Sequence, residues 1–150
     1  MSYKPIGDYG IIGNMLSAAL VGRDGAIDWC CLPRFDSPSS FAALLDDERG
    51  GRFQIRPRSL FDSRQEYVTD TNVLRTTFRT GLGVVALTDF MPCYPDSRGR
   101  IRQLPGIYRL VECTSGEMAL EAIFEPKLDY ARGQTSMAMS KYGVDAHNGA

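Results

Sequence analysis

The fold is decided by the stretch AALVGRDGAIDWCCL at residues 18–32. Two apolar runs, residues 18–21 and 26–32, flank the pair Asp24-Gly25. An Asp-Gly pair between apolar runs is a strong hairpin signal, because glycine readily adopts the positive φ that a tight turn needs. The stretch therefore predicts two antiparallel strands joined at this turn.

Further short segments that favour strands follow at roughly ten-residue spacing. Residues 52–56 alternate in character, with Phe53 and Ile55 on one face and charged side chains on the other. The other predicted strands are 74–79, 84–90, 107–113 and 118–124, and the last two are expected to form a hairpin around the turn 114–116. This pattern predicts an all-β fold, an antiparallel β-sandwich, and 150 residues suit one such domain.

One short connector helix is predicted near residues 38–46. Ser37 is a candidate N-cap, and Pro38 would take the first helical position, where its missing N–H costs nothing. The apolar residues that follow at helical spacing are Phe41, Leu44 and Leu45.

Composition and charge exclude several classes of protein. Hydrophobic residues make up 43% and charged residues 23%, and 17 basic against 18 acidic side chains give a net charge of −1. Binding to nucleic acid or to an acidic membrane surface would need a basic excess. No apolar run approaches the roughly 20 residues of a membrane helix. The first eight residues lack the apolar region of a signal peptide, so a cytoplasmic location is expected.

The cysteines and the single histidine argue against metal and triad chemistry. None of the four cysteines forms a C-x-x-C pair, so reduced thiols are expected and no metal or other cofactor is implied. Cys30 and Cys31 would point to opposite faces of a strand, one into the core and the other to the surface or an interface. His147 lies in a polar terminal segment, where a catalytic role is not expected.

Two segments have the composition of functional loops. The glycine-rich residues 6–14 resemble a phosphate loop only superficially, because no strand precedes them and no G-K-[ST] follows. They are expected to turn tightly and hold Tyr9 on the sheet. The loop after Trp29 carries Arg34, Phe35 and Asp36 between prolines, which is a common arrangement for binding. A purely structural role, with Asp36 capping the helix and Arg34 in a salt bridge, is the alternative.

The chain resembles the N-terminal region of prokaryotic glycoside hydrolase family 15, which contains glucoamylases, glucodextranases and trehalases. The resemblance covers about residues 5–132 and runs in order through many short motifs. The motifs that carry it are Ile6–Gly13, Ser17–Val21, Arg23–Trp29, Cys31–Ser39, Phe41–Asp46, Gly50–Phe53, Thr71–Leu74, Thr88–Pro92 and Phe124–Pro126.

The resemblance implies a non-catalytic N-terminal β-sandwich that packs against an (α/α)6 barrel encoded downstream. In that family the barrel holds the two glutamates of an inverting α-glucoside hydrolase, and nothing in this chain marks such a pair. The chain alone is therefore expected to be inactive and to be a truncated N-domain. Arg34, Phe35, Asp36 and Tyr9 become candidates for the substrate pocket or the barrel interface, and no catalytic residue is assigned.

Two alternatives stay open from the sequence. One is a free-standing carbohydrate-binding or protein-interaction sandwich, which would need exposed aromatic side chains on one sheet face. The other is a fragment whose unpaired strand edges drive self-association.

Overall fold

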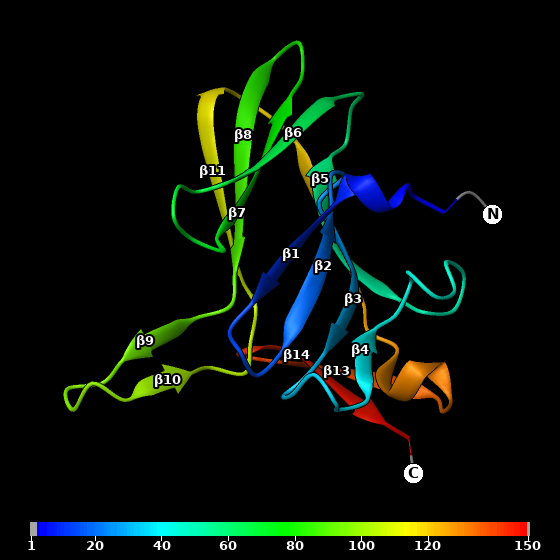
Figure 1. Cartoon of the computed structure of the whole chain (residues 1–150). Helices are drawn as coiled ribbons and strands as arrows, with labels where there is room; N and C mark the ends of the chain where they lie inside the picture. Colours follow the sequence, from blue (N-terminus) through cyan, green and yellow to red (C-terminus); the bar gives the residue numbers. More distant parts are fainter. Residues whose placement is uncertain (1–2, 150) are drawn as a thin grey trace.

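Two antiparallel β-sheets pack face to face in the computed structural model, which describes residues 3–149 (Figure 1). The larger sheet has six strands in the order β1-β2-β3-β5-β12, with β4 pairing with β3. Its strands are β1 (Tyr9–Gly13), β2 (Ala18–Gly22), β3 (Ala26–Cys31), β4 (Ser39–Phe41), β5 (Arg52–Pro57) and β12 (Leu120–Glu125). The predicted all-β sandwich is confirmed.

The second sheet has four strands in the order β11-β8-β7-β6. They are β6 (Asp62–Tyr67), β7 (Leu74–Arg79), β8 (Gly83–Phe90) and β11 (Tyr108–Gly116). Two hairpins stand apart, β9 (Cys93–Pro95) with β10 (Ile101–Gln103) and β13 (Thr135–Ser140) with β14 (Gly143–Asn148). Two 3-10 turns, η1 (Ile6–Asp8) and η2 (Leu128–Ala131), complete the described part of the chain.

The hairpin predicted at residues 18–32 is confirmed. β2 pairs antiparallel with β3, with Ala19 opposite Cys30 and Leu20 opposite Trp29. Gly25 stands in the turn with φ of +76°. A β-bulge between Leu20 and Val21 places Asp28 as the extra residue of β3, which increases the local twist.

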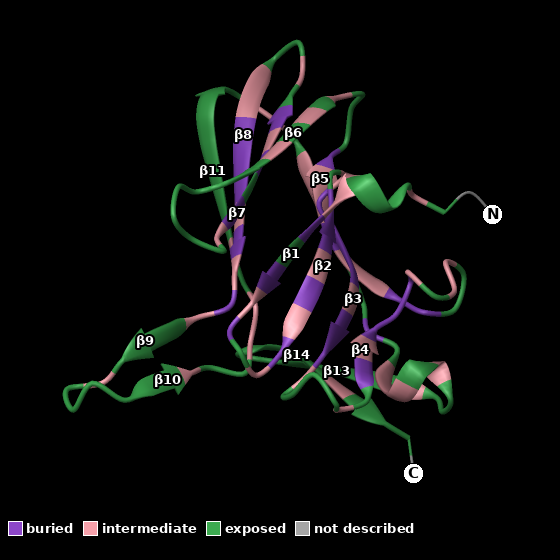
Figure 2. Cartoon of the chain, viewed as in Figure 1, coloured by how far each residue is buried: buried purple, intermediate pink, exposed green. Residues whose placement is uncertain are grey.

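The core lies between the facing sheets, where Figure 2 shows the buried residues concentrated in the central strands. A row of inward residues crosses the six-stranded sheet at Ile12, Ala19, Cys30 and Phe41, which are opposite one another in register. All four are buried in one cluster with Leu74 of β7. Strands β9, β10, β11, β13 and β14 are largely exposed in the same view.

The connector helix predicted near residues 38–46 does not form. Ser39–Phe41 instead make strand β4 along β3, with Phe41 opposite Cys30. Phe41 packs against Phe53 and Phe124, at ring-centroid distances of 6.5 and 5.9 Å. The free edge of β3 and this aromatic cluster outweigh the local helical propensity, which is a weak preference that tertiary contacts readily override.

The hairpin predicted for residues 107–124 is also wrong. β11 pairs with β8 in the four-stranded sheet, whereas β12 pairs with β5 in the six-stranded sheet. A bulge between Cys113 and Ser115 lets β11 continue to Gly116, where a tight turn was expected. The chain then crosses from one sheet to the other, so these strands close the sandwich.

The outer edge of β1 is closed by side chains from the other sheet. The Tyr67 hydroxyl accepts a hydrogen bond from Ile11 N and donates one to Ile11 O, both at 2.9 Å, and Asn72 Nδ2 donates to Gly13 O. These contacts use backbone groups that would otherwise be free to pair with another chain. By contrast, β11 is an edge strand with Leu110 and Val111 exposed on it.

Candidate docking surface

A row of apolar side chains crosses the outer face of the six-stranded sheet. In register, Ile11 of β1 is opposite Leu20 of β2, which is opposite Trp29 of β3. Their neighbours along each strand, Ile12 and Ala19, are buried and point inward, so alternation turns this row away from the core. Ile11 is 57% exposed, and Leu20 and Trp29 are half-buried.

The loop after β3 adds an aromatic side chain to this row. Phe35 packs edge-on against Trp29 with ring centroids 5.3 Å apart, and its backbone N–H donates to Leu16 O at 2.8 Å. Phe35 still exposes 61% of its surface, and Met15 exposes 73%. An apolar hollow of about 340 Å³ lies between Met15, Leu16 and Phe35. We call Ile11, Met15, Leu20, Trp29 and Phe35 the outer patch.

Arg34 and Asp36 flank Phe35 and pair with each other. Arg34 Nε donates to Asp36 Oδ1 at 2.9 Å and Arg34 Nη2 to Oδ2 at 3.3 Å, and both side chains are exposed. The Arg34 guanidinium lowers the pKa of the Asp36 carboxyl through these hydrogen bonds. The expected salt bridge is therefore present. The expected helix cap is not, because Ser37 closes a local turn with Arg34 and no helix follows.

The Tyr9 side chain takes part in a hydrogen-bond network within the domain. Its hydroxyl donates to Asp28 Oδ2 at 2.8 Å, and Lys4 Nζ donates to the same oxygen at 2.6 Å and to Asp24 at 2.8 Å. Burial raises the pKa of Tyr9, so the phenol stays protonated and donates this bond. The network holds the segment before β1 across β2 and β3. Asp28 Oδ1 is buried and has no hydrogen-bond partner among residues 3–149.

The thiols near this face are buried. Cys30 lies in the core, where burial raises the pKa of its thiol to about 12 and keeps it protonated at neutral pH. Cys31 is equally buried, with Sγ 3.5 Å from the Tyr130 hydroxyl. The expectation that one of the pair reaches the surface is wrong, because η2 covers the outer side of β3 there. Residues 3–149 hold no group of three or more metal-ligating side chains.

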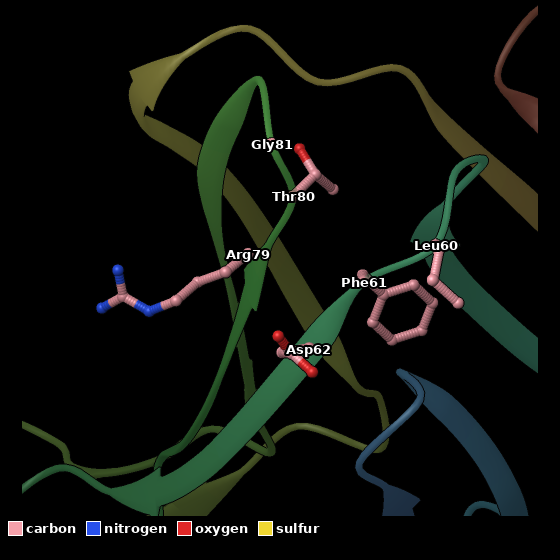
Figure 3. Close-up of a pocket in the computed structure, with 6 residues that line it drawn as sticks. All are labelled: Leu60, Phe61, Asp62, Arg79, Thr80 and Gly81. Atoms are coloured by element: carbon pink, nitrogen blue, oxygen red, sulfur yellow. The ribbon is translucent and has the colours of Figure 1, made fainter.

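A hollow formed by none of the outer-patch residues lacks polar groups that point toward a common centre. It has a volume of about 420 Å³ and lies between the start of β6 and the β7–β8 turn (Figure 3). The Arg79 side chain extends away from the Phe61 and Leu60 side chains in this view. Because Phe61 itself packs edge-on against buried Phe78, at 5.2 Å between centroids, this hollow is part of the packing around β6.

A buried ion pair, not expected from the sequence, lies on the inner face of the four-stranded sheet. Arg109 of β11 binds Asp89 of β8 through two hydrogen bonds of 2.8 and 3.2 Å, and the side chains are 2% and 0% exposed. The guanidinium also donates to Phe53 O and Gly25 O of the other sheet at 2.8 and 2.7 Å. Asp89 stands in line with the apolar positions Val85 and Leu87, and a charge at an inward position signals such a pair.

Comparison with known proteins identifies the family. The profile described as "Trehalase-like, N-terminal" matches residues 2–150. The chain belongs to this trehalase-like N-terminal family.

Relatives of this trehalase-like N-terminal domain include trehalases from archaea and bacteria. The trehalase of Thermoplasma volcanium is 37% identical over 144 residues, which are 94% of this chain and 23% of the relative. The trehalase of Mycolicibacterium smegmatis is 33% identical over 87% of this chain and 21% of its own length. Trehalase 1 of Sulfolobus acidocaldarius is 46% identical over 61% of this chain and 16% of its own length.

These two trehalases match most of this domain, but the domain spans only about a fifth of their own length. No solved structure matches the chain significantly. In residues 3–149 no helix is long and apolar enough to cross a membrane.

Proposed function

We propose that these residues form the non-catalytic N-terminal domain of a trehalase-like glycoside hydrolase and pack against its catalytic domain through the outer patch. The observation that carries the proposal is the outer patch itself, in which Ile11, Met15 and Phe35 are each more than half exposed on an ordered sheet. Contiguous apolar surface on a folded domain marks an interaction site. Family membership names the kind of enzyme to which that partner belongs.

The projecting β9–β10 hairpin supports a docking role. It extends away from both sheets (Figure 1) and pairs with no further strand among residues 3–149. A lone two-stranded hairpin is only marginally stable in water. Tyr94 and Ile101 are about half exposed on opposite faces of the hairpin, so each face offers one large side chain to a neighbour.

Catalysis belongs to the rest of the enzyme in this proposal. The resemblance to glycoside hydrolase family 15 favours an (α/α)6 barrel that carries an acid and a base and cleaves an α-glucosidic bond with inversion. That chemistry needs two carboxyl groups about 6.5–9.5 Å apart on opposite faces of a sugar. We assign this pair of carboxyl groups to the barrel. The N-terminal domain would pack beside the barrel and shape the surroundings of that active site.

Introducing a charge into the outer patch tests the docking. In the longer enzyme, Phe35→Glu should lower the Tm by at least about 4 °C, because a buried carboxylate without a partner costs several kcal/mol. In the 150-residue chain the same change should cost only about 1 kcal/mol, because Phe35 is 61% exposed and loses chiefly its edge-on contact with Trp29. Differential scanning calorimetry measures both. Leu60→Glu is the matched control, because Leu60 is 96% exposed outside the patch. Equal Tm values for the two variants would contradict the docking.

The Arg34–Asp36 pair gives a second test, directed at the substrate pocket. We propose that this pair buttresses the pocket from the edge of the outer patch. Asp36→Ala should then lower kcat/KM of the longer enzyme for trehalose by about tenfold, because small displacements at a substrate pocket are costly. Asp145→Ala, an exposed acid on β14, is the control. Turnover and thermal stability both unchanged in Asp36→Ala would refute this role.

A further inference from the structure

The turn η2 contains three consecutive non-glycine residues in the left-handed region. Asp129, Tyr130 and Ala131 each have φ of 56°. An L-residue pays roughly 1–2 kcal/mol for this conformation. Such strain persists only where the surrounding structure holds it, and it concentrates at ligand-binding and active sites. The turn is therefore held in place by its neighbours and fixes the side chains that it carries.

The surrounding contacts fix Tyr130 at both ends. Its backbone N–H donates to Ser39 Oγ of β4 at 2.9 Å, and its hydroxyl lies 3.5 Å from Cys31 Sγ of β3. At the start of η2, Leu128 N donates to Thr135 Oγ1 at 2.9 Å. Tyr130 nevertheless remains 40% exposed. Tyr130 is thus an immobilised aromatic platform that loses little conformational entropy when a ligand packs on it.

This platform lines a cavity of about 300 Å³, at the lower end of the range for small-molecule sites. Tyr130, Ala131 and Arg132 form one wall, and the segment from Ala42 to Gly50 forms the other, with Leu45, Asp46 and Arg49 in the lining. The Arg132 guanidinium lies 5.8 Å from the Tyr130 ring centroid. An aromatic face and several charged groups thus meet in one hollow.

The charged groups in and beside this cavity form two opposite-charge pairs. Arg132 pairs with Asp129 at 2.6 Å, and Arg49 lies 4.0 Å from Asp46. A site for phosphate or a carboxylate would need an excess of positive charge. A guanidinium has five N–H donors and a carboxylate about four acceptor positions, so each retains capacity beyond its partner. Asp129 lies beside the lining rather than in it, and with Asp129 counted these charges cancel. The cavity therefore offers an apolar face together with uncommitted donors and acceptors.

We propose that this cavity binds one pyranose unit of a neutral saccharide, with the C–H face of the sugar on Tyr130 and its hydroxyls on Arg132, Arg49 and Asp46. A pyranose has one apolar face and a rim of hydroxyl groups, which matches the lining in shape and polarity. The site is separate from the outer patch and needs no contribution from a catalytic domain. Only the choice of glucosides as the first probes rests on the proposed function.

Titration of the 150-residue chain with glucose, maltose, trehalose and galactose, followed by NMR, tests the site. Saturable shifts are expected for residues of η2 and of the segment 42–50. Tyr130→Ala should weaken binding at least tenfold, whereas Tyr130→Phe should stay within about threefold, because it keeps the aromatic ring on which the sugar packs. Arg132→Met should weaken binding about fivefold by removing one charged hydrogen-bond partner.

Tyr142→Ala is the matched control, because Tyr142 is 88% exposed and also has a cation near its ring, Lys141 Nζ at 4.8 Å. Circular dichroism shows whether each variant is folded. If Tyr130→Ala does not fold, Arg132→Met serves as the test of the site. Absence of saturable binding for all four sugars, wild-type affinity in both Tyr130→Ala and Arg132→Met, or displacement of sugar by inorganic phosphate would overturn the proposal. Binding of galactose alone would support the saccharide site and leave the docking proposal to be judged by Phe35→Glu. A lowered Tm in Phe35→Glu without sugar binding would support the docking and overturn the saccharide site.

Discussion

Replacing Arg109 with methionine should lower the free energy of unfolding of the chain by about 3–5 kcal/mol, because the buried Asp89 carboxylate would lose its partner. The guanidinium also satisfies Phe53 O and Gly25 O on the facing sheet, so one substitution removes contacts that join the two sheets. Urea denaturation followed by circular dichroism measures the loss.

The loss should depend on pH in a defined direction. Burial raises the pKa of Asp89, and the Arg109 guanidinium opposes that rise. Without the guanidinium the pKa of Asp89 in the folded state rises further above the unfolded value of about 3.9. A raised folded pKa favours the folded state at low pH, and this advantage is lost as the pH increases through the folded pKa. The variant should therefore be closest to wild type near pH 4 and furthest from it at neutral pH.

Two further variants separate the ion pair from general effects of losing an arginine. Arg56→Met removes one partner of a half-exposed pair with Glu121, which solvent still screens, and should cost only about 1 kcal/mol. The double variant Arg109→Met with Asp89→Leu should regain most of the lost stability, since apolar residues commonly replace a buried pair at little cost. A double variant as unstable as Arg109→Met would show that the carboxylate left behind is not the cause.

The second large effect is expected at Gly25, in the turn that joins β2 and β3. Its φ of +76° disfavours any side chain, and a Cβ placed there would lie 2.1 Å from Ile55 O. The obstacle is backbone, which cannot rotate away, and Gly25 O also accepts hydrogen bonds from Ile55 N and Arg109. Gly25→Ala should therefore cost at least about 3 kcal/mol or abolish folding, at the upper end of single-substitution effects.

Gly99→Ala provides the matched comparison for this substitution. Gly99 has a similar φ of +73°, but no heavy atom lies within 4 Å of its added Cβ. This variant isolates the conformational cost, which should be roughly 1–2 kcal/mol. Thermal unfolding of both variants measures their losses of stability. The difference between the two losses is the cost of the close approach of β5 to Gly25. Equal costs at the two positions would mean that the approach of Ile55 is unimportant.

Local sequence signals predicted individual strands well, because alternation and turn residues act over a few neighbouring positions. The Asp24-Gly25 turn and the alternation in residues 52–56 are of this kind, and both appear in the structure as β2–β3 and β5. The error at residues 38–46 has the opposite origin. Ser37 and Pro38 favour a helix locally, but the edge of β3 and the Phe53–Phe124 cluster draw Phe41 into a strand.

The candidate sites follow the same division. Arg34, Phe35 and Asp36 are consecutive residues of one loop, so the sequence alone places them near one another. Their position beside Ile11 and Met15 depends on pairing between β1, β2 and β3. Tyr130 and Arg49 are separated by about eighty residues and meet only because η2 packs on β4, so no local pattern could have paired them.

An all-β domain with a hairpin at residues 18–32 is predictable from the amino-acid sequence, since turn chemistry and two-residue periodicity are local properties. The sequence also carried the family relationship, through an ordered series of short motifs. The sheet that each strand joins, the contacts by which Arg109 links the Asp89 side of one sheet to the backbone of the other, the outer patch and the Tyr130 cavity are visible in the tertiary structure alone. These features depend on contacts between residues far apart in the chain, whose energies are set by burial and mutual geometry.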